Sequence, residues 1–166
     1  PVESTLEAFR IAKAAGIPTI LNPAPAATIP SELFGLSDIV APNETEAQLL
    51  TGMAVDTLEN VEDAARTLLA RGPDAVIITL GQRGALLLDA EGVGHVPTTE
   101  VNAVDTTGAG DAFIGSLAYL LGVGLPLLQA VGQANTIATM SVMKVGTQVS
   151  FPTREQVTHL IAEFGE

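Results

Sequence analysis

The sequence predicts an α/β fold in which helices flank a largely parallel sheet. Short apolar runs alternate with segments of helical periodicity through the first half of the chain. The run at 75–80 is rich in β-branched residues and carries no charge, which is typical of a strand buried on both faces. Strands that alternate with helices form largely parallel sheets.

Composition indicates one acidic globular domain. The 166 residues include 19 acidic and 7 basic side chains, which gives a formal net charge of −12. That charge disfavours nucleic acid and anionic membranes as partners, since both bind clustered Lys and Arg. The chain has no cysteine, which excludes thiolate nucleophiles and Cys-ligated zinc and favours a reducing, cytoplasmic location.

Capping residues and apolar runs divide the first 100 residues into short elements. Ser4 with Glu7 forms a capping-box pattern, while Asn43 and Asn60 are further candidate N-cap residues. The expected helices cover residues 4–15, 43–52 and 60–72, and the expected strands cover 17–21, 39–41, 75–80, 85–89 and 94–96. The third helix should bury a face formed by Val61, Ala64, Ala65, Leu68 and Leu69.

The C-terminal third is expected to be helical. Residues 112–143 carry no charge, a length that raises the question of a membrane span. Gly, Pro and amide residues interrupt the run and instead predict two buried helices joined by a Gly/Pro turn. Thr153 and Gln156 form a capping-box pattern for a last helix. Its expected apolar stripe consists of Val157, Leu160, Ile161 and Phe164.

The turn at residues 104–113 is the most informative candidate site. Ligands of parallel α/β sheets bind beyond the carboxyl ends of the strands. The small residues Gly108, Ala109 and Gly110 allow close approach of a ligand, and unpaired N–H groups at a helix start bind anions. Asp111 beside them can accept the proton of an attacking hydroxyl. The same residues also suit a tight strand-to-helix turn without a ligand.

Two other turns follow expected strands. Asn43 and Glu46 form a capping box, and the same pair can also lie near phosphate oxygens and Mg²⁺ respectively. The segment 79–84 is expected above all to form a turn. Its second interpretation is a loop that lies beside a bound phosphate. Neither lysine follows a glycine, so there is no P-loop, and Phe113 replaces the third glycine of the dinucleotide fingerprint.

The order and spacing of these segments resemble the ribokinase-like (PfkB) carbohydrate kinases. The Gly108–Asp111 segment is specific for that superfamily. The resemblance is closer to its ribose-specific branch than to its fructose or adenosine kinases, and it implies a three-layer, Rossmann-like sheet. It runs through Asn22-Pro23-Ala24-Pro25, Pro42–Ala47, Thr79-Leu80-Gly81 with Gly84, Asp105–Phe113, Asn135 and Gly146-Thr147-Gln148 with Ser150.

The resemblance implies an enzyme that transfers the γ-phosphoryl group of MgATP to a sugar hydroxymethyl group, with D-ribose giving ribose 5-phosphate. Asp111 would then be the general base, and the amides of Gly108, Ala109 and Gly110 would stabilise the transferred group. The implied nucleotide-binding residues are Asn43, Thr79, Gly81, Gly84 and Asn135. The implied metal sites are Glu46 for Mg²⁺, and Asp105, Thr107, Ser141, Gly146 and Ser150 for K⁺.

The main departure from the family is length. The resemblance identifies residues 1–166 as a C-terminal nucleotide-binding and catalytic portion, without the N-terminal sugar-binding half and lid. A chain that begins at Pro1 therefore looks like part of a longer enzyme, and we expect little or no kinase activity from it alone. The open alternatives are a fructokinase or nucleoside kinase, or a noncatalytic nucleotide-binding or interaction module. A homodimer is possible.

Overall fold

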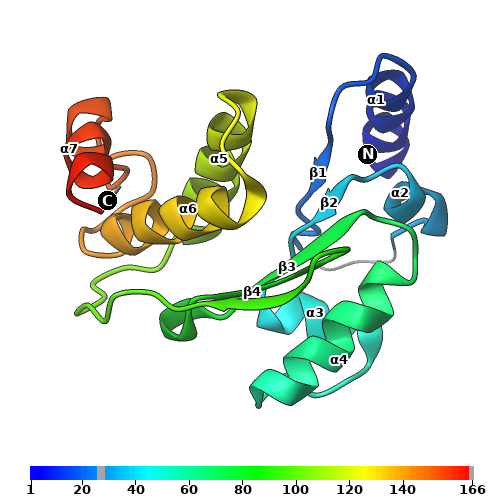
Figure 1. The fold of residues 1–166 in the computed structure, drawn as a ribbon, viewed down its shortest axis with the longest axis horizontal. Coiled ribbons are helices and arrows are strands. Elements are labelled where there is room, and N and C mark those ends of the chain that lie inside the picture. The colour runs from blue at the N-terminus through cyan, green and yellow to red at the C-terminus, as the bar shows by residue number, and fades with distance from the viewer. Residues whose placement is uncertain (26–28, 165–166) are drawn as a thin grey trace. The chain divides into compact units, whose positions relative to one another are not determined.

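The structure, a computed structural model, describes the backbone of residues 1–25 and 29–164 and the side chains as far as residue 159. Its described residues form two compact units. The first contains residues 1–81 and 85–95, and the second contains residues 82–84 and 96–166. Figure 1 shows the helices and strands of each unit.

A five-stranded sheet in the order β1-β2-β3-β4-β5 forms the frame of the first unit. The parallel strands are β1 (Ile20–Leu21), β2 (Ile39–Val40) and β3 (Ala75–Thr79). β4 (Ala85–Asp89) runs antiparallel to β3, and β5 (Gly92–Val96) forms the edge. The predicted α/β class is confirmed, with a mixed sheet in which the first three strands are parallel.

Helices supply the rest of this unit. They are α1 (Val2–Ala14), α2 (Ser31–Gly35), α3 (Glu44–Thr51) and α4 (Leu58–Leu69). α3 and α4 pack against each other, and α4 also packs on β3 and β4 (Figure 1). The predicted apolar face of α4 is confirmed, since four of its side chains are buried and Leu69 is half-buried against the core; the buried ones are Val61, Ala64, Ala65 and Leu68.

Two predicted helix starts are wrong. α1 begins at Val2 because the carbonyl of Pro1 accepts from the N–H of Ser4 at 3.1 Å, so Ser4 lies inside the helix. α4 begins at Leu58 because Thr57 Oγ1 accepts from the N–H of Asn60 at 3.1 Å. In both places the chain entered the helix a few residues before the predicted cap. The short helix α2 was not predicted at all.

The second unit is helical and contains α5 (Ala109–Gly122), α6 (Leu127–Ser141) and α7 (Arg154–Phe164). α5 and α6 pack against each other, which confirms the two helices predicted within 112–143. In the part of the chain that the structure describes, no helix has the length and apolar character of a membrane span.

The predicted capping box before α7 is also confirmed. Thr153 N donates to Gln156 Oε1 at 2.8 Å, and Gln156 N donates to Thr153 Oγ1 at 3.4 Å. Val157 of the predicted stripe is half-buried. The other three members, Leu160, Ile161 and Phe164, lie outside the described side chains.

Candidate functional site

In the first unit, the ends of two neighbouring parallel strands bring the predicted residues together. Asn43 follows β2 and forms a parallel bridge with Thr79, the last residue of β3. The N–H of Thr79 donates to the carbonyl of Pro42 at 3.0 Å. Gly81 follows in a left-handed conformation, φ 55°, at the start of a 3₁₀ turn. Asn43, Thr79 and Gly81 therefore lie at the carboxyl edge of this sheet, where α/β proteins bind ligands.

Asn43 and Glu46 form the predicted capping box of α3. Asn43 Oδ1 accepts from the N–H of Glu46 at 2.9 Å, and Glu46 Oε2 accepts from the N–H of Asn43 at 2.8 Å. Glu46 is only 6% exposed, so the box holds a buried carboxylate in a defined orientation. The capping box uses Oε2 of Glu46. Oε1 of the same carboxylate therefore remains as an oxygen ligand of the kind that Mg²⁺ prefers.

In the second unit, the predicted anion-binding turn starts α5. Gly108 is the N-cap residue with φ 85°, a left-handed conformation that favours glycine. The N–H of Ala109 donates to the carbonyl of Thr106 at 3.2 Å. The expectation of three unpaired amides is therefore wrong for Ala109, because the turn closes on itself. Among the described residues, none accepts a hydrogen bond from the N–H of Gly108 or Gly110.

Asp111 lies in the first turn of α5 and is exposed. The ion pairs recorded among the described residues do not include it. Its side chain lines a cavity of about 570 Å³, together with Ser116 and Tyr119 of α5, Phe151, and Arg154 of α7. The carboxylate is thus open to a small molecule.

Hydrogen bonds to the side chain of Asp105 stabilise the loop that precedes this turn. Its Oδ1 accepts from the N–H of Thr107 at 2.9 Å, and its Oδ2 accepts from the N–H of Gly146 at 2.9 Å. The N–H groups of Val104 and Asp105 both donate to the carbonyl of Val142, at 2.7 and 3.2 Å. The bond from Gly146, followed by those from Thr107, lowers the pKa of Asp105 to about 2.

This lowered pKa gives the Asp105 loop a defined pH dependence. In the folded chain the pKa of Asp105 lies below the unfolded value of about 3.9. The ionised carboxylate therefore contributes its full stabilisation of the folded state above about pH 4, and this contribution is lost as the pH falls through about 2. We expect the amide signal of Gly146 in NMR spectra to titrate with a midpoint near pH 2. Asp105→Asn should abolish this titration, and a midpoint at or above pH 4 would contradict the assignment.

The other residues predicted for K⁺ lie along the same segments. Ser141 and Ser150 are each 1% exposed; Ser141 Oγ donates to the carbonyl of Ala138 and Ser150 Oγ to that of Thr147, both at 2.7 Å. Ser141 immediately precedes Val142, whose carbonyl accepts hydrogen bonds from the N–H groups of Val104 and Asp105. Of the residues predicted for K⁺, Thr107 and Gly146 contact the carboxylate of Asp105 through their N–H groups, whereas Ser141 and Ser150 bond to carbonyls of their own segments. The described residues contain no group of three or more His, Asp or Glu that could hold a metal ion.

Gly84 and Asn135, both predicted to bind nucleotide, both lie close to the carbonyl oxygen of Val96. Asn135 is 6% exposed, and its Nδ2 donates to the carbonyl of Val96 at 3.1 Å. A Cβ on Gly84, where φ is 88°, would lie 2.0 Å from the same carbonyl oxygen. Sequence reasoning missed Val96, because a backbone carbonyl carries no side-chain signal.

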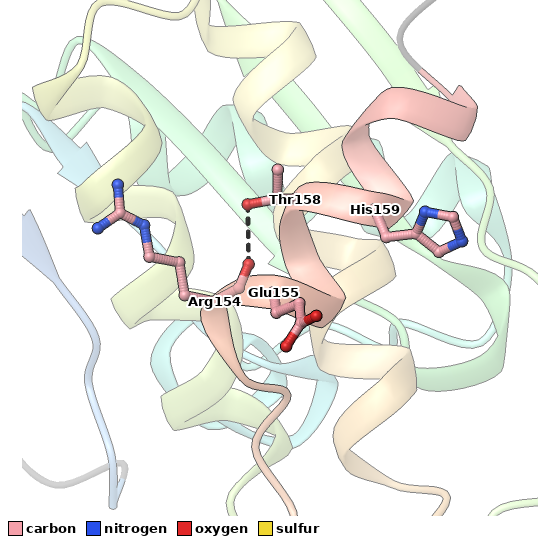
Figure 2. A pocket seen from close by; sticks show the side chains of 4 residues that line it. All are labelled: Arg154, Glu155, Thr158 and His159. Carbon is pink, nitrogen blue, oxygen red and sulfur yellow. Dashed lines mark hydrogen bonds between the residues drawn. The ribbon is translucent and has the colours of Figure 1, made fainter.

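A second depression lies on α7 and contains none of the predicted residues. It is lined by Arg154, Glu155, Thr158 and His159. Thr158 Oγ1 donates to the carbonyl of Arg154 at 2.8 Å, and the side chains of Arg154 and His159 point away from each other (Figure 2). Its charged groups therefore do not converge on one point.

Comparison with known proteins finds a family and a set of relatives. The model of the pfkB family of carbohydrate kinases matches residues 1–154. A ribokinase of Staphylococcus aureus is 41% identical over 161 residues, covering 96% of this chain and 53% of the relative. A deoxyribokinase of Salmonella typhimurium is 40% identical and is covered to the same extent, 53%. The chain thus spans about half the length of these curated relatives.

A solved structure gives the same result for the fold. The structure of Arabidopsis thaliana ribokinase complexed with ribose and ATP superposes with a TM-score of 0.91 at 31% identity. The match covers 97% of this chain and 53% of the Arabidopsis chain.

Proposed function

Because the chain belongs to the pfkB family of carbohydrate kinases, we propose that it carries the nucleotide-binding and catalytic residues of an ATP-dependent ribose kinase. The observation that carries this proposal is the start of α5. There, the exposed residue Asp111 lines a cavity, and the same first turn of the helix carries the N–H groups of Gly108 and Gly110. A base and an anion-binding turn at one helix start are the groups that phosphoryl transfer to an alcohol requires.

Asp111 removes the proton from the sugar hydroxymethyl group as its oxygen bonds to the γ-phosphorus of ATP. The bond between that phosphorus and the β,γ-bridging oxygen breaks, and ADP leaves. The N–H groups of Gly108 and Gly110, at the positive end of the α5 dipole, stabilise the charge on the transferred group. Ala109 contributes by closing the turn through its bond to Thr106. Positioning and charge stabilisation are the main requirements of a loose transition state.

The first unit binds nucleotide phosphates through Asn43, Thr79 and Gly81, and Glu46 is the residue that holds Mg²⁺. The buried capping box keeps Glu46 in one orientation. When bound, Mg²⁺ neutralises charge on the phosphate oxygens.

In the second unit, Gly84 and Asn135 are the proposed nucleotide-binding residues. K⁺ is held near Asp105, whose carboxylate accepts from the N–H groups of Thr107 and Gly146; the proposed residues are Asp105, Thr107, Ser141, Gly146 and Ser150.

The function is tested by ADP release from ATP with D-ribose as the acceptor. We expect the full-length gene product to turn over with ribose faster than with 2-deoxyribose, fructose or adenosine. We expect the chain of 166 residues alone to show little or no turnover. Omission of Mg²⁺ should abolish the activity, and replacement of K⁺ by a bulky organic cation should lower it.

Each alternative predicts a different outcome of this assay. Faster turnover with 2-deoxyribose would make the enzyme a deoxyribose kinase, which the similarity to the Salmonella relative allows. A full-length product that binds ATP but transfers phosphate to none of the four acceptors would favour the noncatalytic nucleotide-binding module.

A further inference from the structure

Hydrogen bonds attach residues 96–105, which lead from the end of β5 to the loop before α5, to one face of α6. At one end of this segment, the carbonyl of Val96 accepts from Asn135 Nδ2 at 3.1 Å. At the other end, the carbonyl of Val142, the C-cap residue of α6, accepts from two N–H groups of the Asp105 loop at 2.7 and 3.2 Å. Both ends contain residues of the proposed function, since Asn135 is assigned to the nucleotide and Asp105 to K⁺.

A pair of threonine hydroxyls lies between these two ends and has no role in the assignments made above. Thr98 Oγ1 and Thr139 Oγ1 are 2.6 Å apart, and both residues are half-buried. Thr139 follows Asn135 by four residues and precedes Val142 by three, so these residues lie on one face of α6. The threonine pair is therefore a third point at which the segment contacts this helix.

The direction of the hydrogen bond between the two hydroxyls follows from their other contacts. Thr139 Oγ1 donates to the carbonyl of Asn135 at 2.8 Å. Because a hydroxyl group has only one proton, Thr139 Oγ1 accepts from Thr98 Oγ1 in the pair. Thr98 is thus bonded through Thr139 to the backbone of Asn135, and the side chain of Asn135 is bonded to Val96.

A proline makes the link between Thr98 and Val96 stiff. Pro97 has a φ fixed at about −65°, and it restricts the residue before it to extended conformations. The position of Thr98 on α6 therefore determines where the carbonyl of Val96 lies. That carbonyl in turn orients the amide of Asn135, because the last torsion of an asparagine side chain has no sharp preference of its own.

We propose that Thr98 is a positioning residue for the nucleotide site: its bond to Thr139 keeps the carbonyl of Val96 at Asn135 Nδ2. Because Asn135 is only 6% exposed, water does not readily replace that carbonyl as the partner of its amide. The effect on Asn135 stands on these hydrogen bonds alone, whereas the effect on ATP binding rests on the proposed function.

NMR spectroscopy of the full-length gene product with isotope-labelled asparagine tests the effect on Asn135. Thr98→Val replaces the hydroxyl group by a methyl group of similar size. We expect the Asn135 Nδ2 proton that is bonded to Val96 to exchange with solvent about tenfold faster or more, because the segment opens more easily. Thr139→Val removes the acceptor of the same bond, so the double variant should not exceed the larger single effect.

Matched variants separate this hydroxyl from general effects of the substitution. Thr99→Val makes the same change at the neighbouring, exposed threonine and should leave the Asn135 signal unchanged. Thr98→Ser keeps the hydroxyl and should recover most of the protection. Unchanged exchange in Thr98→Val, an equal acceleration in Thr99→Val, or full additivity of Thr98→Val with Thr139→Val would overturn the proposal.

Steady-state kinetics of the same protein test the consequence for ATP. Thr98→Val should raise the KM for ATP about 3- to 10-fold, the usual cost of one hydrogen bond, while kcat and the KM for ribose change less than about twofold. A loss of folded protein would lower kcat without this change in KM. In an Asn135→Ala background, Thr98→Val should have no further effect on the KM for ATP.

The two experiments fail separately. An unchanged KM for ATP in Thr98→Val, or an equal rise in the Asn135→Ala background, would overturn the role in nucleotide binding. If the wild-type protein has no kinase activity, the proposed function fails, while the exchange experiment still decides whether Thr98 positions Asn135.

Discussion

On the proposed function, we expect Asp111→Asn to lower kcat of the full-length gene product by a factor of about 10² or more, because loss of a general base typically costs 10² to 10⁴ in rate. Asn retains the size and the hydrogen-bonding oxygen of the side chain but cannot accept the proton of the sugar hydroxyl. The KM for ATP should change little, since in the proposed mechanism the carboxylate acts on the acceptor oxygen and its removal affects mainly the transition state. The measurement is ADP release at saturating ribose and ATP.

The control for this prediction is an acidic residue in the first turn of another helix. Glu59 is exposed and lies in the first turn of α4, as Asp111 does in α5. Glu59→Gln removes an equivalent helix–charge interaction, worth about 0.3–1 kcal/mol, and should leave kcat unchanged. A kcat for Asp111→Asn within a few-fold of wild type would assign the base to another group.

Local patterns predicted the features that depend on nearby residues. Asn43 and Glu46 are three residues apart and form their capping box through bonds within one turn of helix, so spacing alone was sufficient. The buried strand β3 and the buried face of α4 followed from hydrophobic periodicity. The position of Asp111 at an exposed helix start followed from the small residues before it.

Features that depend on distant segments were not predictable in this way. The bond from Gly146 to Asp105 joins residues 41 positions apart and uses a backbone N–H, which has no sequence signature. Phe151 belongs to no motif, and it lines the cavity beside Asp111 only because the chain returns to α5 after α6. The pairing of the Ala109 amide within its own turn was missed because small residues indicate closeness but not which carbonyl is reached.

Gly84→Ala is expected to have the largest effect on stability. A Cβ at this position would lie 2.0 Å from the carbonyl oxygen of Val96 and 2.9 Å from the Cα and the carbonyl carbon of Pro97. These are backbone atoms, so they cannot rotate away as a side chain would, and the φ of 88° is itself unfavourable for alanine. We expect a loss of about 2–4 kcal/mol in the free energy of unfolding, measured by urea denaturation.

Gly81→Ala separates the clash at Gly84 from the cost of a left-handed alanine. Gly81 has φ 55°, but a Cβ there would meet no atom within 4 Å, so the expected loss is only about 1 kcal/mol. The clash also has a local consequence, because the carbonyl of Val96 accepts the hydrogen bond of Asn135 Nδ2. The side-chain amide signals of Asn135 should therefore shift in Gly84→Ala and stay in place in Gly81→Ala. Equal losses of stability in the two variants would mean that backbone conformation alone, rather than contact with Val96, requires glycine at position 84.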